Sequence, residues 1–387
     1  MLPRPGAGER AVRGLPGCRP VAAGAVALIL AILVLDCAAA RNSAPARPSR
    51  GTPHEVVFTH YGPLFGSAAV LRRVLSPLAR QSVREVLARS HRTLERYPLD
   101  LAKERFLLYV PSEPPPAGGF ALLVWVSPSD QAHLPFGWTQ QLERYRVVFV
   151  APERAGNAEA VIGRRVPLAL AAERNVVRDY PIDRGHVYIG GFSGGSRVAE
   201  RVALDYPDVF DGALLDAGSD PLGSADPWVG VVTLPRRKLF RRFQSSSHLV
   251  YVSGELDTAN LASDASSSRS MRDWCVFGVE THEARHLGHE IIGGGTFRRA
   301  LDRLLDYQIP SDPARLRACR SRIKSELESQ LGRVRALISQ GRRDAARKLL
   351  LEIDNRYGGL ASPRSIELAR RCACGLAVLG ERSRKSG

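Results

Sequence analysis

The stretch that decides the fold runs from His186 to Ser196 and reads HVYIGGFSGGS. A β-branched and aromatic run ends in glycines around one serine, and a helical pattern begins at Arg197. This order predicts a strand, a tight turn and a helix, with Ser193 at the corner. Such a turn needs residues without a β-carbon two positions before and two after the serine, here Gly191 and Gly195, or strand and helix would collide. We therefore expect Ser193 in a strained conformation, with its hydroxyl outward, at the positive end of the following helix.

Apolar runs on both sides of this turn predict further strands. They are Phe106–Val110, Phe120–Val126, Val147–Val150, Gly212–Leu215, Leu249–Val252 and Val276–Val279. Helical patterns separate several of them, at Leu168–Val177 and Val198–Tyr206, and a further apolar stripe spans Phe297 to Leu305. Continuously apolar strands that alternate with helices are typical of a mostly parallel α/β sheet covered on both faces.

The two ends of the chain differ from this middle part. Four arginines precede an uncharged apolar run from Val21 to Leu35, which Ala38-Ala39-Ala40 follows. This pattern predicts a cleaved signal peptide over residues 1–40, and a lipid anchor through Cys37 is a weaker alternative because Asp36 precedes it. A linker follows over 41–55, the α/β domain over 56–310, and a helical hairpin extension resembling one tetratricopeptide-type unit over 311–387.

The chain of 387 residues carries a net charge of +16. The arginines are scattered and no aromatic-basic motif accompanies them, so we do not expect a nucleic-acid partner. For an exported protein, the charge suits an anionic envelope surface or polymer. The charge is equally consistent with a general preference for arginine in this sequence, without any binding partner.

Six cysteines are present, and Cys18 and Cys37 would be lost with the signal peptide. An oxidising compartment would allow a bridge from Cys319 to Cys372 or Cys374. The closely spaced pair could instead be two buried thiols, and the sequence leaves the pairing open.

A serine hydroxyl becomes nucleophilic only when a base takes its proton and a third group orients that base. Asp257 follows the strand at Leu249–Val252, and His289 follows the last predicted strand. Because parallel strands end at one edge of a sheet, Ser193, Asp257 and His289 are expected to meet there. Asp264 and Asp216 compete for the acidic role, and His286 and His282 for the basic one.

The chain resembles the α/β-hydrolases, and within them the secreted polyhydroxybutyrate-depolymerase and feruloyl-esterase type. The similarity covers roughly Phe106 to Leu305. It is carried by Ile182-Asp183, Gly191-Phe-Ser-Gly-Gly195, Tyr206-Pro-Asp-Val-Phe-Asp-Gly-Ala213, Gly254 to Asp257, and Gly288-His289. It implies an exported serine esterase, without a cofactor, in which Ser193 attacks an ester carbonyl, His289 moves the proton and Asp257 holds the imidazole.

The resemblance also implies that the Gly194 N–H forms half of an oxyanion hole. The other half should come from the loop after Trp125, where such esterases usually carry a His-Gly pair. This chain has Ser127-Pro128-Ser129-Asp130 there. Pro128 has no N–H to donate, so the Ser129 amide is the candidate.

Two other classes of protein stay open at this stage. His282, Glu283 and His286 match the H-E-x-x-H pattern of zinc peptidases, which binds metal only if the stretch is helical. An apparent strand just before and Gly288 just after leave barely one turn. The other alternative is a non-catalytic envelope-binding protein on the same fold.

Overall fold

The structure, a computed structural model, describes residues 49–226, 230–307 and 312–372. The predicted signal peptide and Cys374 lie outside these ranges. Within them, no helix combines the length and apolar character that crossing a bilayer requires.

An eight-stranded sheet forms the centre of the fold, in the order β1-β2-β4-β3-β5-β6-β9-β10. Pairing from β4 to β10 is parallel, and β1 and β2 add an antiparallel edge. The strands are β1 (Pro53–Val56), β2 (Phe106–Tyr109), β3 (Phe120–Val126), β4 (Val147–Pro152), β5 (Ile182–Phe192), β6 (Gly212–Asp216), β9 (His248–Gly254) and β10 (Val279–Ala284). A small separate ribbon pairs β7 (Ala225–Asp226) with β8 (Gly230–Val231).

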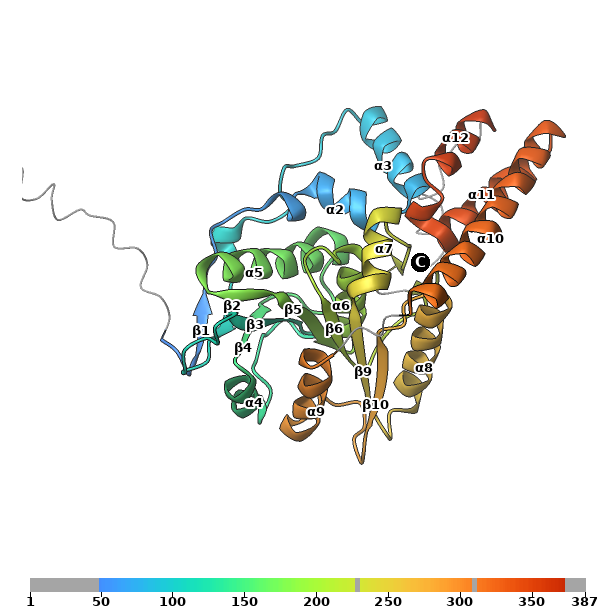
Figure 1. Ribbon diagram of the computed structural model, residues 1–387. Helices are drawn as coiled ribbons and strands as arrows, with labels where there is room; N and C mark the ends of the chain where they lie inside the picture. The colour runs from blue at the N-terminus through green and yellow to red at the C-terminus, as the bar shows by residue number, and fades with distance from the viewer. Residues whose placement is uncertain (1–48, 227–229, 308–311, 373–387) are drawn as a thin grey trace, which may run out of the picture. The chain divides into compact units, whose positions relative to one another are not determined.

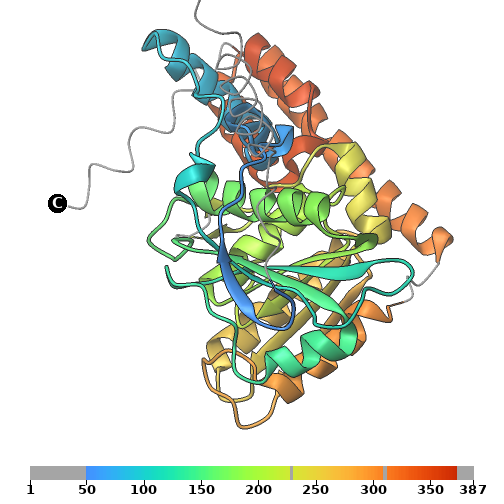
Figure 2. The same ribbon diagram turned by 90° about the vertical axis from the view of Figure 1, so that its left-hand side faces the viewer.

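Helices cover both faces of this sheet, as Figures 1 and 2 show. One face carries α2 (Ser67–Val74), α5 (Val166–Asp179), α6 (Gly194–Asp205) and α7 (Arg237–Ser246). The other carries α4 (Trp138–Tyr145) and α9 (Gly294–Leu305). All seven residues of β3 are buried, as expected for a central strand between two helical layers. The predicted α/β-hydrolase fold is confirmed by this layout.

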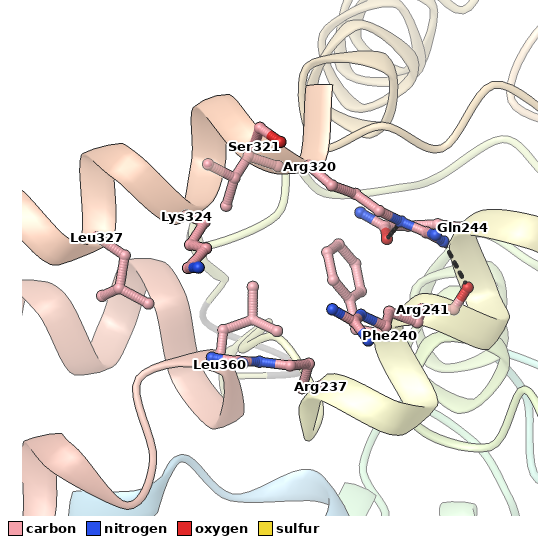
Figure 3. Close-up of a pocket in the computed structure, with 10 residues that line it drawn as sticks. Arg237, Phe240, Arg241, Gln244, Arg320, Ser321, Lys324, Leu327 and Leu360 are labelled. Atoms are coloured by element: carbon pink, nitrogen blue, oxygen red, sulfur yellow. Dashed lines mark hydrogen bonds between the residues drawn. The ribbon is translucent and has the colours of Figure 1, made fainter. Parts of the chain in front are cut away.

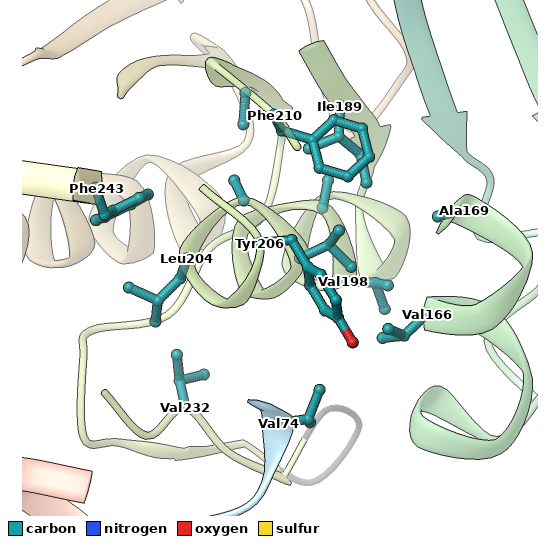
Figure 4. Close-up of a cluster of buried hydrophobic side chains, with 14 of the residues drawn as sticks. Val74, Val166, Ala169, Ile189, Val198, Leu204, Tyr206, Phe210, Val232 and Phe243 are labelled. Carbon is teal, nitrogen blue, oxygen red and sulfur yellow. The ribbon is translucent and has the colours of Figure 1, made fainter. Parts of the chain in front are cut away.

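Helix α6 is the best-buried helix of the first layer. Val198 and Leu204 are fully buried, and they pack with Val166 of α5, Ile189 of β5 and Phe243 of α7 (Figure 4). Fully burying side chains of this kind stabilises the fold by roughly 1.5–3 kcal/mol each. The helix that begins at Ser193 is therefore fixed from several sides.

The predicted extension consists of α10 (Pro313–Ser339), α11 (Arg343–Tyr357) and α12 (Arg364–Arg371). The break between the first two helices falls at Gly341, whose φ of 73° ends the helical run. Buried Asp354 of α11 accepts hydrogen bonds from the Ser76 hydroxyl and the Leu78 N–H at the start of α3 (Pro77–Arg89). The extension is thereby joined to the lead-in helices by a buried polar contact.

The sequence allowed a bridge from Cys319 to Cys372 or Cys374 and left the pairing open, and the structure gives Cys319 another partner. Cys319 pairs with Cys275, not with Cys372 or Cys374. The bridge therefore joins α10 to the segment between α8 (Thr258–Asp273) and β10.

Two strand boundaries also differ from the prediction. Strand β10 begins at Val279, where the strand predicted over Val276–Val279 was expected to end. Strand β1 occupies the last residues of the predicted linker and pairs with β2.

Candidate active site

Ser193 lies at the corner between β5 and α6. Its φ of 54° and ψ of −123° are strained for a residue with a side chain, and its N–H donates to the Asp216 carbonyl. A β-carbon at Gly191 would lie 2.7 Å from the Ser196 nitrogen, and one at Gly195 would lie 2.8 Å from the Val126 carbonyl carbon. Both glycines are therefore required sterically. A side chain at Gly191 would collide with the first residues of α6, as expected. A side chain at Gly195 would instead collide with the end of β3, and not with β5, the strand that leads into the turn.

The three residues expected to converge do meet at this edge of the sheet. Nε2 of His289 lies 2.9 Å from the Ser193 hydroxyl, and Nδ1 lies 2.6 Å from Oδ2 of Asp257. With its proton on Nδ1, the ring donates to the carboxylate and can accept the serine proton at Nε2. The ring of Phe192 packs against His289, with ring centroids 5.0 Å apart.

Asp257 is held as a charged group. It caps α8 and accepts hydrogen bonds from the backbone and the carboxamide of Asn260, in addition to that from His289. Burial acts to raise the pKa of Asp257, but these hydrogen bonds outweigh burial, and the pKa lies below its usual value. Asp257 is thus an ionised carboxylate that can fix the ring and stabilise an imidazolium.

The competing acids point elsewhere. Asp264 accepts hydrogen bonds from the hydroxyls of Ser219 and Ser253, and Asp216 accepts one from the Ile292 N–H. Both carboxylates lie among buried groups and have raised pKa values because of that burial.

The rival histidines are in no position to act as the base either. His282 lies on β10 and accepts a hydrogen bond from Arg299, while the exposed His286 has a φ of 58° and lies beside Glu255. The zinc-peptidase alternative requires a helix across His282, Glu283 and His286, and the stretch is a strand followed by a turn. Two imidazoles four residues apart therefore do not share one helical face here, and this alternative fails on geometry.

The two predicted oxyanion donors differ in their surroundings. Gly194 is the first residue of α6, so its N–H has no partner within the helix and is free to bind an anion. The Ser129 N–H instead donates to the Ser127 hydroxyl at 3.1 Å. The hydroxyl of Ser129 is also engaged, with Ser127 and with the Gln131 carbonyl. Its amide is therefore already used inside its own loop.

One residue at this site went unnoticed in the sequence. A β-carbon at Gly194 would lie closest to Oδ1 of Asn157, with Cγ and Nδ2 at 2.8 and 2.9 Å, so this carboxamide lies directly against Gly194. Asn157 follows β4 in an Ala-Gly-Asn-Ala loop, a composition that carries no catalytic signal by itself.

No family model matches the chain, and no curated protein matches it either. Solved structures resemble it at low identity. An acetyl xylan esterase from Aspergillus awamori is 12% identical, with a TM-score of 0.39, and the match covers 52% of this chain and 94% of that one. An S-formylglutathione hydrolase from Staphylococcus aureus is 12% identical, with a TM-score of 0.39, over 52% of this chain and 90% of that one.

A thermostable esterase is 14% identical, with a TM-score of 0.36, over 47% of this chain. The matched part spans about half of that esterase, 51% of its length. Likeness at this level concerns only the arrangement of the chain.

Proposed function

We propose that this protein is a serine hydrolase that cleaves carboxylic esters through an acyl-enzyme. The observation that carries the proposal is the continuous chain of hydrogen bonds from Ser193 through His289 to Asp257. A serine held in a strained turn, with an imidazole at hydrogen-bond distance and a buried carboxylate behind it, has the three parts that an activated nucleophile needs.

In this mechanism the Ser193 Oγ attacks the ester carbonyl carbon while its proton passes to Nε2 of His289. The carbonyl oxygen becomes an oxyanion facing the Gly194 N–H. The intermediate collapses, the C–O bond to the alcohol breaks, and His289 returns the proton to the departing oxygen. Water then attacks the acyl-enzyme by the same route, releasing the acid and restoring Ser193.

The side chain of His289 is 46% exposed, so an ester can reach the site from solvent. The test is labelling with a fluorophosphonate probe, together with turnover of p-nitrophenyl butyrate. We expect the probe to modify Ser193 and to abolish turnover in proportion to the label incorporated. An unlabelled Ser193 in folded protein would overturn the proposal and favour a non-catalytic binding protein on the same fold.

We also propose that the protein is exported. The arginine-flanked apolar run before Ala38-Ala39-Ala40 supports this, and so does the Cys275–Cys319 disulfide, because such bridges persist in oxidising compartments. Expression of the full chain in a bacterial host tests it. We expect the mature protein outside the cytoplasm with a new N-terminus close to residue 41, whereas cytoplasmic protein that retains Met1 would contradict it.

A further inference from the structure

The proposed hydrolysis leaves one half of the oxyanion hole unfilled, because the Ser129 amide donates to Ser127. Acyl transfer usually relies on two donors aimed at the developing oxyanion. The missing group should lie beside the Gly194 N–H, and Asn157 is in contact with Gly194.

The Asn157 carboxamide is suited to this task. The residue is exposed, and no other described residue forms a hydrogen bond with its side chain. Its nitrogen and oxygen exchange places by rotation about the Cβ–Cγ bond, so the NH₂ group can turn toward an anion. A free carboxamide next to the first amide of α6 is the type of donor that serves oxyanion holes in other hydrolases.

The backbone beneath this side chain is fixed. The Asn157 N–H donates to the Pro128 carbonyl at 2.9 Å, and the Gly156 N–H donates to the Asp130 carboxylate at 3.1 Å. A β-carbon at Gly156 would lie 2.9 Å from the Asp130 nitrogen, so only glycine allows the two loops to pack this closely. The loop after β3 therefore holds the loop after β4 in place.

Resting on the proposed ester hydrolysis, we infer that Asn157 is a catalytic residue whose Nδ2 donates to the oxyanion beside the Gly194 N–H. The proton transfers stay with Ser193 and His289, and Asn157 exchanges no proton. The loop after β3 does not provide the second donor. It holds the backbone of the loop that does.

The experiment compares Asn157→Ala with wild type and with Asn355→Ala, a matched amide removal at an exposed position on α11. We expect kcat for p-nitrophenyl butyrate to fall about 100-fold in Asn157→Ala, with KM little changed and Asn355→Ala unaffected. Affinity for a boronic acid, whose tetrahedral adduct with Ser193 places an oxygen in the same position, should fall by a similar factor.

Asn157→Asp covers the case in which the alanine variant does not fold, because aspartate has nearly the same shape and would repel the oxyanion. We expect its loss of kcat to be at least as large. A folded Asn157→Ala or Asn157→Asp with wild-type kcat and boronate affinity would overturn the inference while leaving the ester hydrolysis intact. Failure of the hydrolysis itself would instead appear as a wild-type protein that neither turns over ester nor takes the fluorophosphonate.

A second, independent observation concerns a pocket between α7 and α10. Four cationic side chains line it, Arg237 and Arg241 from α7 and Arg320 and Lys324 from α10 (Figure 3). None of the four has a carboxylate within ion-pair distance in the described part of the chain. Glu328, one turn beyond Lys324, pairs with Arg364 instead.

Arg320 is held by uncharged oxygens. It donates to the Gln244 side chain at 2.7 Å, the Arg241 carbonyl at 2.8 Å and the Ser245 hydroxyl at 2.9 Å. Burial lowers the pKa of Arg320, and the nearby charge of Arg241 lowers it further. The Cys275–Cys319 disulfide fixes the residue just before it. The positive charge here is therefore fixed in place and lacks a counterion among the described residues.

The pocket also has an apolar wall, to which Phe240 and Leu327 contribute, and a volume of about 150 Å³. A cavity of that size accommodates a group about as large as a benzene ring. We propose that this pocket binds an oxyanion head group, carboxylate or phosphate, that carries an apolar group of about this size. Guanidinium groups match the geometry of both heads.

Calorimetric titration tests this second proposal with phenyl phosphate, benzoate and inorganic phosphate as ligands. We expect one of the two aromatic ligands to bind more tightly than inorganic phosphate, and the better one identifies the head group. Arg241→Gln/Lys324→Gln should weaken binding roughly 30-fold, since each charge contributes about fivefold. Arg317→Gln/Lys348→Gln removes the same net charge at exposed positions outside the pocket. Equal weakening by both pairs, or equal affinity for inorganic phosphate, would overturn the proposal.

Discussion

Ser193 is needed for activity, but its backbone conformation lowers the stability of the fold. Its φ of 54° and ψ of −123° suit glycine far better than serine. We expect Ser193→Ala to fold normally and to lose turnover of p-nitrophenyl esters. Ser193→Gly should lose turnover as well but be more stable than Ser193→Ala by roughly 1 kcal/mol, because glycine relieves the backbone strain. Chemical denaturation of the two variants measures this difference, and equal stabilities would show that the turn stores no strain.

The second residue-scale prediction concerns Asp257. In Asp257→Asn the amide can donate to Nδ1 of His289, which favours the ring tautomer with its proton on Nε2, where the serine proton should go. We expect kcat to fall about 10,000-fold without loss of the fold. Steady-state kinetics alongside circular dichroism checks this. A folded variant within tenfold of wild type would mean that another group orients the ring.

Strand ends and chain order carry information about which loops meet, so the sequence could predict that Ser193, Asp257 and His289 would lie together. The resemblance favoured Asp257, but the residue pattern alone kept Asp264 and Asp216 as competitors, since the direction of a side chain in a loop depends on contacts with distant parts of the chain. Asn157 was missed for a related reason. Its surroundings become distinctive only once Gly194 lies against it.

At the scale of elements, central strands were easier to predict than edge strands. All seven residues of β3 are buried, so the strand reads as one apolar run. Strand β10 lies at the sheet edge and is buried only at its two ends, Val279 and Ala284, and its sequence VETHEA looks polar. The neighbouring Cys275 and Val276 are buried, although they lie outside the strand, in the segment that leads into it. An apolar run therefore indicated burial correctly but misplaced the strand.

The Cys275–Cys319 disulfide gives a prediction at the same scale. It closes a loop with a sequence separation of 44 and ties α10 to the segment before β10. Because the bridge restricts the unfolded chain, Cys275→Ser/Cys319→Ser should lower the free energy of unfolding by up to about 4 kcal/mol. Denaturant titration measures the loss. Esterase activity below the unfolding transition should be retained, because the bridge lies away from Ser193, and an inactive but folded double variant would contradict this.

For the molecule as a whole, the extension was expected from its helical periodicity, but its attachment was not. Asp354 of α11 binds the start of α3, and Tyr357 packs edge-on against Trp274, with ring centroids 5.5 Å apart. The first contact joins residues 276 apart in sequence and the second joins residues 83 apart, and periodicity within one helix contains no information about either. The described residues from 49 onward accordingly belong to one compact unit.

Buried carboxylates beneath the active-site turn predict how stability depends on pH. Burial raises the pKa of Glu200 to about 8 and that of Asp264 to about 6, and it raises the pKa of Asp216 as well. In the unfolded chain these groups titrate near pH 4. Between those values the folded protein binds more protons than the unfolded one, so stability is lost as pH rises through the folded pKa values. We expect a melting temperature several degrees higher near pH 5 than near pH 9.

The net charge of +16 opposes this trend at lower pH, because protonation of exposed carboxylates increases the repulsion within the folded protein. Maximal stability should thus fall close to pH 5. Glu200→Gln isolates the contribution of this one carboxyl group. The glutamine keeps an oxygen that accepts from the Asp220 N–H. The hydroxyls of Ser267 and Tyr251, which donate to Glu200, can rotate to accept from the glutamine NH₂ group. Melting temperatures of this variant should vary less between about pH 6 and pH 9 than those of wild type. An unchanged slope would mean that Glu200 is ionised in the folded protein and that its burial is compensated by the groups around it.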